Sequence, residues 1–336
     1  MTARRLLGGS RLIEISTQHE IFSVFFTEDG KQVVSGGEEG VLRRWRVDVG
    51  QEVGEPIRTE GAEIYAAALS PDRERLVCGL RRLEPVNDGE TDAIVWDAQT
   101  HEKVFDVHGH ENTVFSVDIS PDSMQFATGG CNKLAFIWSM RTGKRLVGPL
   151  EHDDAVIMVR FSPDGDRLAT ATGTSDDEDP KSICIYDSEN GQQLLEIPCC
   201  QFSQNSSSPL AWSTDGLQLF AASSGEVKCF DTSSGTLLSK WSIPDADESP
   251  ASIILSRNQK FAVVVASKSL TFWDTSTGYM QIGSEIEHTS NVWSIALSPS
   301  DDCIVTGEEN GKVTLRSLCD ILPSSYLTVN VSNAIH

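Results

Sequence analysis

The sequence predicts an all-β fold in which seven repeated antiparallel sheets form a closed ring. Three observations support this prediction: a phrase that returns seven times, apolar residues that alternate with polar ones, and turn residues between the apolar runs. Each copy contains an anchor residue, aromatic in all but the last copy, and successive anchors are 42 to 51 residues apart. The anchors are Trp45, Trp96, Trp138, Tyr186, Phe230, Trp273 and Arg316. A period of about 40–45 residues is typical of repeat architectures.

The third copy shows the elements of one repeat. Residues 114–119 alternate between two faces, which is the period-2 pattern of a strand. Ser120-Pro121-Asp122 then predicts a turn, because proline presets φ and aspartate bonds to nearby backbone. A second run covers 126–130, a third carries Trp138, and a weaker fourth covers 145–147. Four short strands with tight turns predict one antiparallel sheet in each copy.

Two insertions lengthen the second and fourth copies. They cover residues 81–92 and 175–180. Both are polar and contain proline, so we interpret them as exposed loops between strands.

The two ends of the chain complement each other. Residues 11–15 stand before His19 in the same way as residues 145–147, a predicted fourth strand, stand before His152. They therefore predict a fourth strand that is not preceded by the first three strands of a repeat. The seventh copy has only three strands. We therefore expect the N-terminal strand to complete the last sheet and close the ring, which covers sheet edges. The domains are then an N-terminal arm at 1–10, one domain at 11–319 and a C-terminal tail at 320–336.

Several short motifs recur in this frame: Gly109-His110, the Ser-Pro-Asp turns, Thr306-Gly307, and the pairs Trp96-Asp97 and Trp273-Asp274. On these residues the chain resembles WD40 repeat proteins over about 11–319, with degenerate repeats. The resemblance implies a seven-bladed β-propeller of four-stranded antiparallel blades, with the ring closed by the N-terminal strand. The Ser-Pro-Asp-Gly turn at 162–165 is similar to those of fungal and bacterial members, including the sensor ends of NACHT-type ATPases.

The resemblance also implies a buried network of Asp, His, Ser or Thr, and Trp in each blade. The residues at signature positions are His19, Ser35, Trp45, Trp96, Asp97, His110, Thr128, Trp138, His152, Thr170, Trp273, Asp274, His288 and Thr306. Asn132 and Asn310 stand where Asp is expected, as does Glu39 in the first copy. No copy has the full set, so we expect packing to supply more of the stability.

Composition narrows the class of partner. The chain has 336 residues and a formal net charge of −22, from 49 acids and 27 bases. This charge argues against nucleic acids and anionic membranes, and suits a soluble protein or one with a basic partner. Eight cysteines without a Cys-x-x-Cys spacing predict reduced thiols in an intracellular, cytoplasmic or nuclear setting.

The sequence contains no motif of a known catalytic, cofactor-binding or metal-binding site. Histidines at equivalent positions on different blades lie far apart in a ring, whereas a metal needs ligands within a few ångströms. Phosphate-binding loops, nucleophile elbows and His-Glu-x-x-His motifs are missing from the sequence. We therefore predict no catalytic, cofactor-binding or metal-binding residues.

The residue at the start of the first strand is aromatic in some copies and not in others. At the start of each first strand, four consecutive copies around the ring carry an aromatic residue: Trp293, Phe22, Tyr65 and Phe115. The other three carry Ile157, Ser208 and Ala251. In WD40 propellers this position lies near the channel mouth, where peptides often bind, so these aromatics predict a partner-binding crescent. Packing at strand ends is the other interpretation.

The function predicted is a non-catalytic protein–protein interaction scaffold that binds peptides or proteins through loops and the channel mouth. We expect a monomeric fold within a larger complex. A sensor or substrate-recruiting module with its effector on another chain is an alternative. From another class, a hydrolase with carboxylates at the channel is the rival interpretation.

Overall fold

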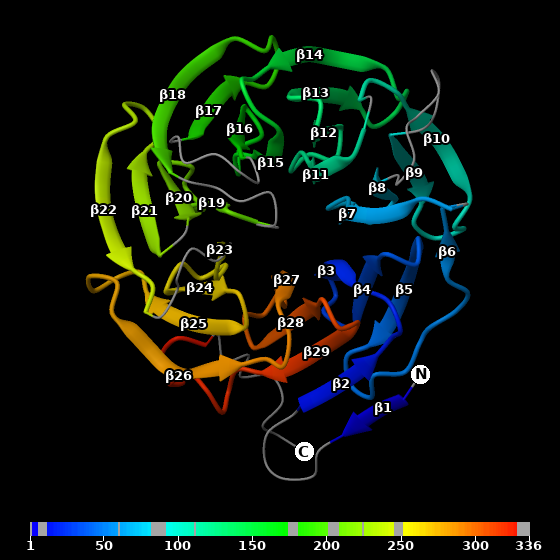
Figure 1. Ribbon diagram of the computed structural model, residues 1–336, viewed down its shortest axis with the longest axis vertical. Helices are drawn as coiled ribbons and strands as arrows, with labels where there is room; N and C mark the ends of the chain where they lie inside the picture. The colour runs from blue at the N-terminus through cyan, green and yellow to red at the C-terminus, as the bar shows by residue number, and fades with distance from the viewer. Residues whose placement is uncertain are drawn as a thin grey trace.

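The ring of sheets predicted from the repeats is present in the computed structural model (Figure 1). The structure describes residues 2–5, 12–59, 61–81, 92–110, 112–173, 181–200, 208–223, 225–244 and 251–327. Most of both predicted insertions lies outside these residues. The described residues form strands and turns, without a helix, so the all-β prediction is confirmed.

Each sheet is one blade, and the blades follow one another around the ring. Blade 1 contains β3 (Ile21–Phe26), β4 (Gln32–Gly37), β5 (Val41–Arg46) and β6 (Ile57–Arg58). Blade 2 contains β7 (Glu63–Leu69), β8 (Arg75–Arg81), β9 (Ala93–Asp97) and β10 (Lys103–Val107). Blade 3 contains β11 (Val114–Ile119), β12 (Gln125–Gly130), β13 (Leu134–Ser139) and β14 (Arg145–Glu151). Blade 4 contains β15 (Val156–Phe161), β16 (Arg167–Thr172), β17 (Lys181–Asp187) and β18 (Gln193–Cys200).

The remaining blades complete the circle. Blade 5 contains β19 (Leu210–Trp212), β20 (Gln218–Ser223), β21 (Glu226–Asp231) and β22 (Leu237–Ser242). Blade 6 contains β23 (Ala251–Leu255), β24 (Phe261–Ala266), β25 (Ser269–Asp274) and β26 (Gln281–Glu287). Blade 7 contains β27 (Val292–Leu297), β28 (Cys303–Glu308), β29 (Lys312–Ser317), β2 (Leu12–Ser16) and β1 (Thr2–Arg5). The first strand of each copy lies innermost, around the centre of the ring (Figure 1).

The predicted closure of the ring is confirmed. Strand β2 pairs antiparallel with β29, with Ile13 opposite Leu315 and Ile15 opposite Val313. Ile13 and Ile15 are buried in the seam between blades 7 and 1. Strand β1 then adds a fifth strand outside β2, which the repeat pattern did not predict.

The Ser-Pro-Asp turns hold the first two strands of a blade together. In blade 3 the Ser120 hydroxyl donates to Asp122 at 2.6 Å and accepts the Gln125 amide at 2.9 Å. Ser162 and Ser213 make the same pattern in their blades. These short polar residues satisfy backbone groups that the turn leaves unpaired, which is why the motif recurs.

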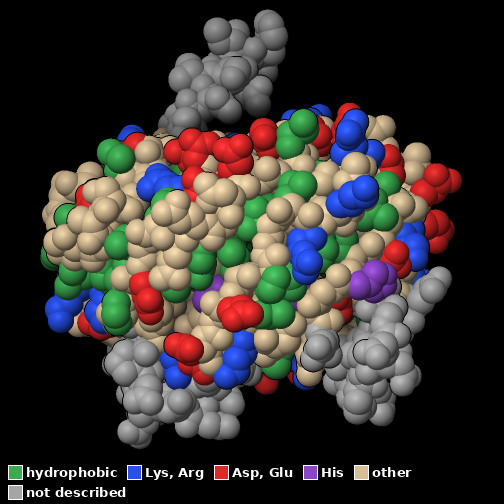
Figure 2. All heavy atoms as spheres, turned by 90° about the horizontal axis from the view of Figure 1, so that it is seen from above, with side chains coloured by type: hydrophobic (Ala, Val, Ile, Leu, Met, Phe, Trp, Pro, Cys, Tyr) green, Lys and Arg blue, Asp and Glu red, His purple; other side chains and the backbone are tan. Residues whose placement is uncertain are grey.

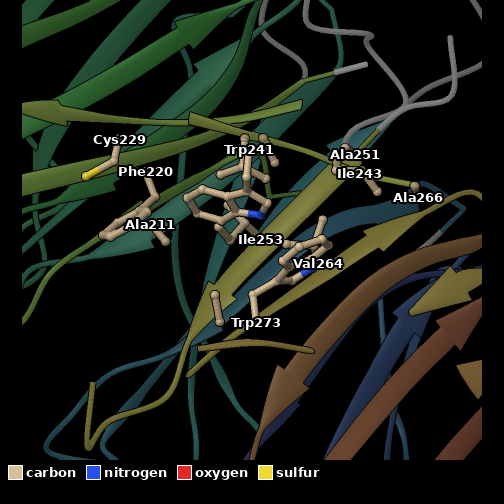
Figure 3. Packing of buried hydrophobic residues seen from close by; sticks show 13 residues of the cluster. Ala211, Phe220, Cys229, Trp241, Ile243, Ala251, Ile253, Val264, Ala266 and Trp273 are labelled. Atoms are coloured by element: carbon tan, nitrogen blue, oxygen red, sulfur yellow. The ribbon is translucent and has the colours of Figure 1, made fainter. Parts of the chain in front are cut away.

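The core consists of seven apolar clusters among the described residues, each between two neighbouring blades. Figure 3 shows the cluster between blades 5 and 6, where Phe220, Trp241 and Trp273 lie among smaller side chains. The Trp241 ring also stacks on Tyr279, with ring centroids 4.2 Å apart. A blade therefore buries its two faces only against its neighbours, as expected for repeats that are not stable alone.

The C-terminal segment 318–327 packs on this core. Leu318, Leu322 and Leu327 are buried in the cluster between blades 6 and 7. The Tyr326 hydroxyl donates to Asp274 Oδ2 at 2.6 Å. Burial of three leucines indicates that this segment stabilises the packing of blades 6 and 7.

Candidate functional site

The signature histidine of blade 3 belongs to a buried relay of hydrogen bonds. Trp138 Nε1 donates to Thr128 Oγ1 at 2.9 Å, and Thr128 Oγ1 lies 2.8 Å from His110 Nε2. His110 Nδ1 lies 2.9 Å from Asn132 Oδ1. His110 is 5% exposed, and burial lowers its pKa to about 4. The relay joins β12, β13, the turn between them and the segment before β11, which is a structural role.

Blade 4 forms a variant of this relay. His152 Nε2 lies 2.9 Å from Thr170 Oγ1, and the Tyr186 hydroxyl lies 3.2 Å from the same nitrogen. His152 Nδ1 bonds the carbonyl of Leu150 at 3.0 Å. A backbone oxygen thus takes the acceptor role expected for Asp in a WD40 repeat.

Blades 1 and 7 depart further from the pattern. Trp45 Nε1 donates to Ser35 Oγ at 2.8 Å, but His19 lies 3.5 Å from Glu38 instead. Glu39, expected to replace Asp as the partner of His19, bonds Arg43 at 2.8 Å. A cavity of about 10 Å³ is lined by both His19 and Ser35.

In blade 7, His288 Nε2 lies 3.1 Å from Thr306 Oγ1. Asn310, expected at the Asp position, donates instead to Thr289 Oγ1 at 3.1 Å. Arg316 stands where Trp is usual, and burial lowers its pKa.

The Trp-Asp pairs shape the turn between the third and fourth strands. Asp97 accepts the amides of Gln99 and Thr100 at 3.0 and 2.9 Å. Asp274 accepts the Ser276 amide at 2.6 Å, in addition to the hydroxyl of Tyr326. These bonds lower the pKa of both carboxyl groups, because they favour the charged form. The tryptophans differ: Trp273 Nε1 bonds Thr271 Oγ1, whereas Trp96 Nε1 is buried without a partner.

The aromatic residues singled out at the strand starts are partly brought together. Phe22 stacks on Tyr65 with ring centroids 5.2 Å apart, and Tyr65 meets Phe115 edge-on at 5.3 Å. The ring contacts of the described residues include none between Trp293 and Phe22. Phe22 is only 8% exposed, so little of its ring is open to a partner, whereas Tyr65, Phe115 and Trp293 are half-buried. We name Tyr65, Phe115 and Trp293 the aromatic row.

An acidic group borders this row, and the sequence alone did not indicate it. The Glu20 carboxylate is crowded by Glu38, Glu309 and Glu63, and burial together with these like charges raises its pKa. Burial also raises the pKa of Glu63. These four glutamates come from three different blades, so only the folded ring assembles them. We name Glu20, Glu38, Glu63 and Glu309 the acidic rim.

One cation already lies at this place. Arg81 Cζ lies 6.0 Å from the centre of the Phe22 ring, and its Nε lies 3.6 Å from Glu63 Oε2. Aromatic faces and carboxylates both attract guanidinium and ammonium groups. The arrangement is therefore suited to binding positively charged side chains.

Within the residues that the structure describes, His, Cys, Asp and Glu do not gather in threes that could hold a metal ion. Nor does that part of the chain form a helix of the length and hydropathy needed to span a bilayer. On the side of the ring seen in Figure 2, acidic side chains follow the upper rim and basic ones are interspersed among them.

Comparison with known proteins supports the repeat assignment. The family model described as "WD domain, G-beta repeat" matches residues 101–139, 144–187 and 281–316. A search of curated proteins finds no match. The matched segments correspond to much of blades 3, 4 and 7, which are the blades with a His–Thr contact. The chain therefore carries WD40 repeats at three positions and folds as a seven-bladed β-propeller.

Proposed function

We propose that this protein is a non-catalytic scaffold that binds a basic peptide segment of another protein at the aromatic row and acidic rim. WD40 propellers generally bind other proteins, and the rigid ring can present a surface with little ordering cost on binding. The observation that carries the proposal is that Glu20 and Glu63 are partly buried beside Tyr65 and close to other glutamates, which raises the pKa of both carboxyl groups.

The electrostatics indicate why the partner is basic. Each raised pKa means that the folded protein destabilises a negative charge at that position. A lysine or arginine from a partner would favour the charged carboxylates, in the way that Arg81 lowers the pKa of Glu63. The net charge of −22 also favours encounter with basic segments.

The test compares partner recovery between matched variants. Tagged wild-type protein and the double variant Glu20→Gln/Glu63→Gln are used for affinity purification with quantitative mass spectrometry. The control is Glu102→Gln/Glu189→Gln, which removes the same charge from two exposed glutamates in turns between third and fourth strands. We expect one or more basic partners to fall at least tenfold with the first pair and to be unchanged with the control.

The aromatic row is tested separately with Tyr65→Ala and Trp293→Ala. Loss of the same partners, at an unchanged melting temperature, supports binding through the row. A lower melting temperature with unchanged partner recovery would assign these rings to packing and contradict the proposal. Equal losses in the acidic pair and in its control would show that only overall charge matters, which contradicts the proposed site.

A further inference from the structure

A cavity of about 180 Å³ lies between blades 1 and 2, away from the aromatic row. Strand β3 connects the two places, with Phe22 at its start and Phe25 near its end. Phe25 lines the cavity together with Leu42, Leu69 and Leu76. The cavity therefore has an apolar wall and lies near the turns that join first and second strands.

The cavity lies where the outer strand of blade 1 is short. Strand β6 has only two residues, whereas the fourth strands of the other blades have five to eight. The outer strands of blades 2, 3 and 4 cover the turn of the next blade. A side chain at Gly143 would collide with Phe105 of the preceding blade, and one at Gly191 with Val147. Blade 1 lacks such a cover.

Arg44, in the cavity lining, occupies a position that is apolar in every other blade. It is the residue just before the anchor of the third strand. Its equivalents are Val95, Ile137, Ile185, Cys229, Phe272 and Leu315, none more than 4% exposed. Burial lowers the pKa of Arg44, and no ion pair joins it to a carboxylate within the described part of the chain. The adjacent Arg43, by contrast, pairs with Glu39 and Glu52 at 2.8 and 2.7 Å.

His101, also in the lining, is equally exceptional. It stands in the turn between third and fourth strands with φ of 62°. Blades 1, 3, 4, 5 and 6 have the same turn, and the residue at this place is glycine in each of them. These glycines all have positive φ: Gly50, Gly143, Gly191, Gly235 and Gly278. A side chain with positive φ is strained, and such strain is often found at ligand-binding places. His101 Nε2 is buried and has no hydrogen-bond partner.

The charges around the cavity favour an anion. Two arginines, Arg44 and Arg73, line it with a single carboxylate, Asp29. That carboxylate is already engaged, since it accepts the Thr27 hydroxyl at 2.7 Å and the Lys31 amide at 3.0 Å. Burial and the nearby Arg44 lower the pKa of His101, so its imidazole acts as a neutral hydrogen-bond donor. A cationic cluster beside an apolar wall is unexpected in a chain of net charge −22.

The volume limits the size of what can enter. Ligand pockets for whole cofactors or drug-sized molecules measure about 300–1,000 Å³, whereas a cavity of about 150 Å³ holds one benzene. A cavity of about 180 Å³ thus suits a single side chain with the size of leucine or phenylalanine. Because the cations lie in the same lining, the entering group should carry a carboxylate close to the apolar part.

We propose that this cavity binds an acidic peptide segment of a partner protein. One large apolar side chain enters between blades 1 and 2, and a neighbouring carboxylate pairs with Arg44 and accepts a hydrogen bond from His101 Nε2. The site is distinct from the aromatic row and acidic rim, which suit a basic segment. The scaffold then holds two segments of opposite charge at opposite ends of β3.

The experiment uses variants that restore the repeat pattern. Arg44→Leu and His101→Gly each introduce a residue type found at the equivalent position of other blades, so both proteins should fold with an unchanged or higher melting temperature. Arg46→Leu is the control, because it removes a charge from an exposed position on the same strand. If Arg44 and His101 only filled space, Arg44→Leu and His101→Gly would lower the melting temperature and leave peptide binding unchanged.

The probe is a displayed library of random heptapeptides, selected on the wild-type protein and depleted on Arg44→Leu/His101→Gly. We expect the remaining peptides to pair Leu or Phe with Asp or Glu. Synthetic versions should bind the wild type and the Arg46→Leu control equally, and each single cavity variant at least tenfold more weakly. Replacing the peptide's Asp by Asn should weaken binding to a similar extent.

Two outcomes would overturn the proposal. In the first, no peptide distinguishes the wild type from the double variant, or the selected peptides lack a carboxylate. In the second, 3-phenylpropionate binds as tightly as the selected peptide, which would make the cavity a site for a small organic acid.

Discussion

At the scale of single residues, the direction of the blade 3 relay follows from its one fixed acceptor. Asn132 Oδ1 can only accept, so His110 Nδ1 carries the proton and His110 Nε2 accepts from the Thr128 hydroxyl. Thr128 Oγ1 in turn accepts from Trp138. Every polar group in the relay is satisfied while the imidazole is neutral. Because Asn replaces a charged Asp here, nothing in the relay compensates a protonated, buried His110.

This neutrality predicts a pH dependence of stability. The pKa of His110 is about 4 in the folded protein against 6.5 for an ordinary histidine, because burial disfavours the charged form. The unfolded chain therefore binds a proton between pH 6.5 and 4 that the folded chain does not. Stability due to this group is complete above pH 6.5 and is lost as the pH falls, by about 2 kcal/mol between pH 7 and 5.

Urea unfolding at several pH values measures this effect. The comparison is between the wild type and His110→Gln, which has the same other titrating groups. We expect the wild type to lose about 2 kcal/mol more than the variant between pH 7 and 5. Parallel pH profiles for the two proteins would contradict a buried, neutral His110.

At the scale of elements, local chemistry explains what the sequence could predict. The alternation at 114–119 and the turn at Ser120 depend on neighbouring residues, so β11 and its turn were predicted. The closeness of Tyr65 and Phe115 could also be predicted from the sequence, because aligned repeats put equivalent residues of neighbouring blades side by side. The acidic rim, the short β6 and the docking of 318–327 could not be predicted, because they depend on contacts between distant segments or on a missing cover.

The docked C-terminal segment gives a prediction at this scale. Tyr326→Phe removes the hydroxyl that donates to Asp274, which is buried beside the turn of blade 6. A hydrogen bond to a charged group contributes about 1.5–3 kcal/mol, and we expect a loss near the lower end because Asp274 keeps its bonds to Ser276 and Thr277. Chemical denaturation measures the change. Ser324→Ala, at an exposed position of the same segment, should leave stability unchanged, and equal behaviour of the two variants would argue against docking through Tyr326.

At the scale of the whole molecule, closure turns a row of repeats into a ring. Repeat proteins with open ends behave as chains of nearest-neighbour interfaces, in which terminal units unfold first. Here β2 comes from the start of the chain and pairs with β29 near its end, so no blade is terminal. Each blade faces an apolar cluster on both sides, including blades 7 and 1. Opening the seam should therefore expose two blade faces at once and weaken the whole ring.

The seam can be tested with two substitutions on one strand. Ile15→Ala removes apolar volume from a buried side chain in β2, and such truncations cost about 2–5 kcal/mol. Glu14→Ala is the control, because Glu14 points to the other face of the same strand. Hydrogen exchange in mild denaturant then follows amides of β12 in blade 3 and β20 in blade 5, both far from the seam along the chain. If closure couples the ring, Ile15→Ala accelerates their slow exchange as much as that of β28, whereas Glu14→Ala does not. Acceleration confined to blades 7 and 1 would mean that the blades open as independent units, because a local opening leaves distant amides protected.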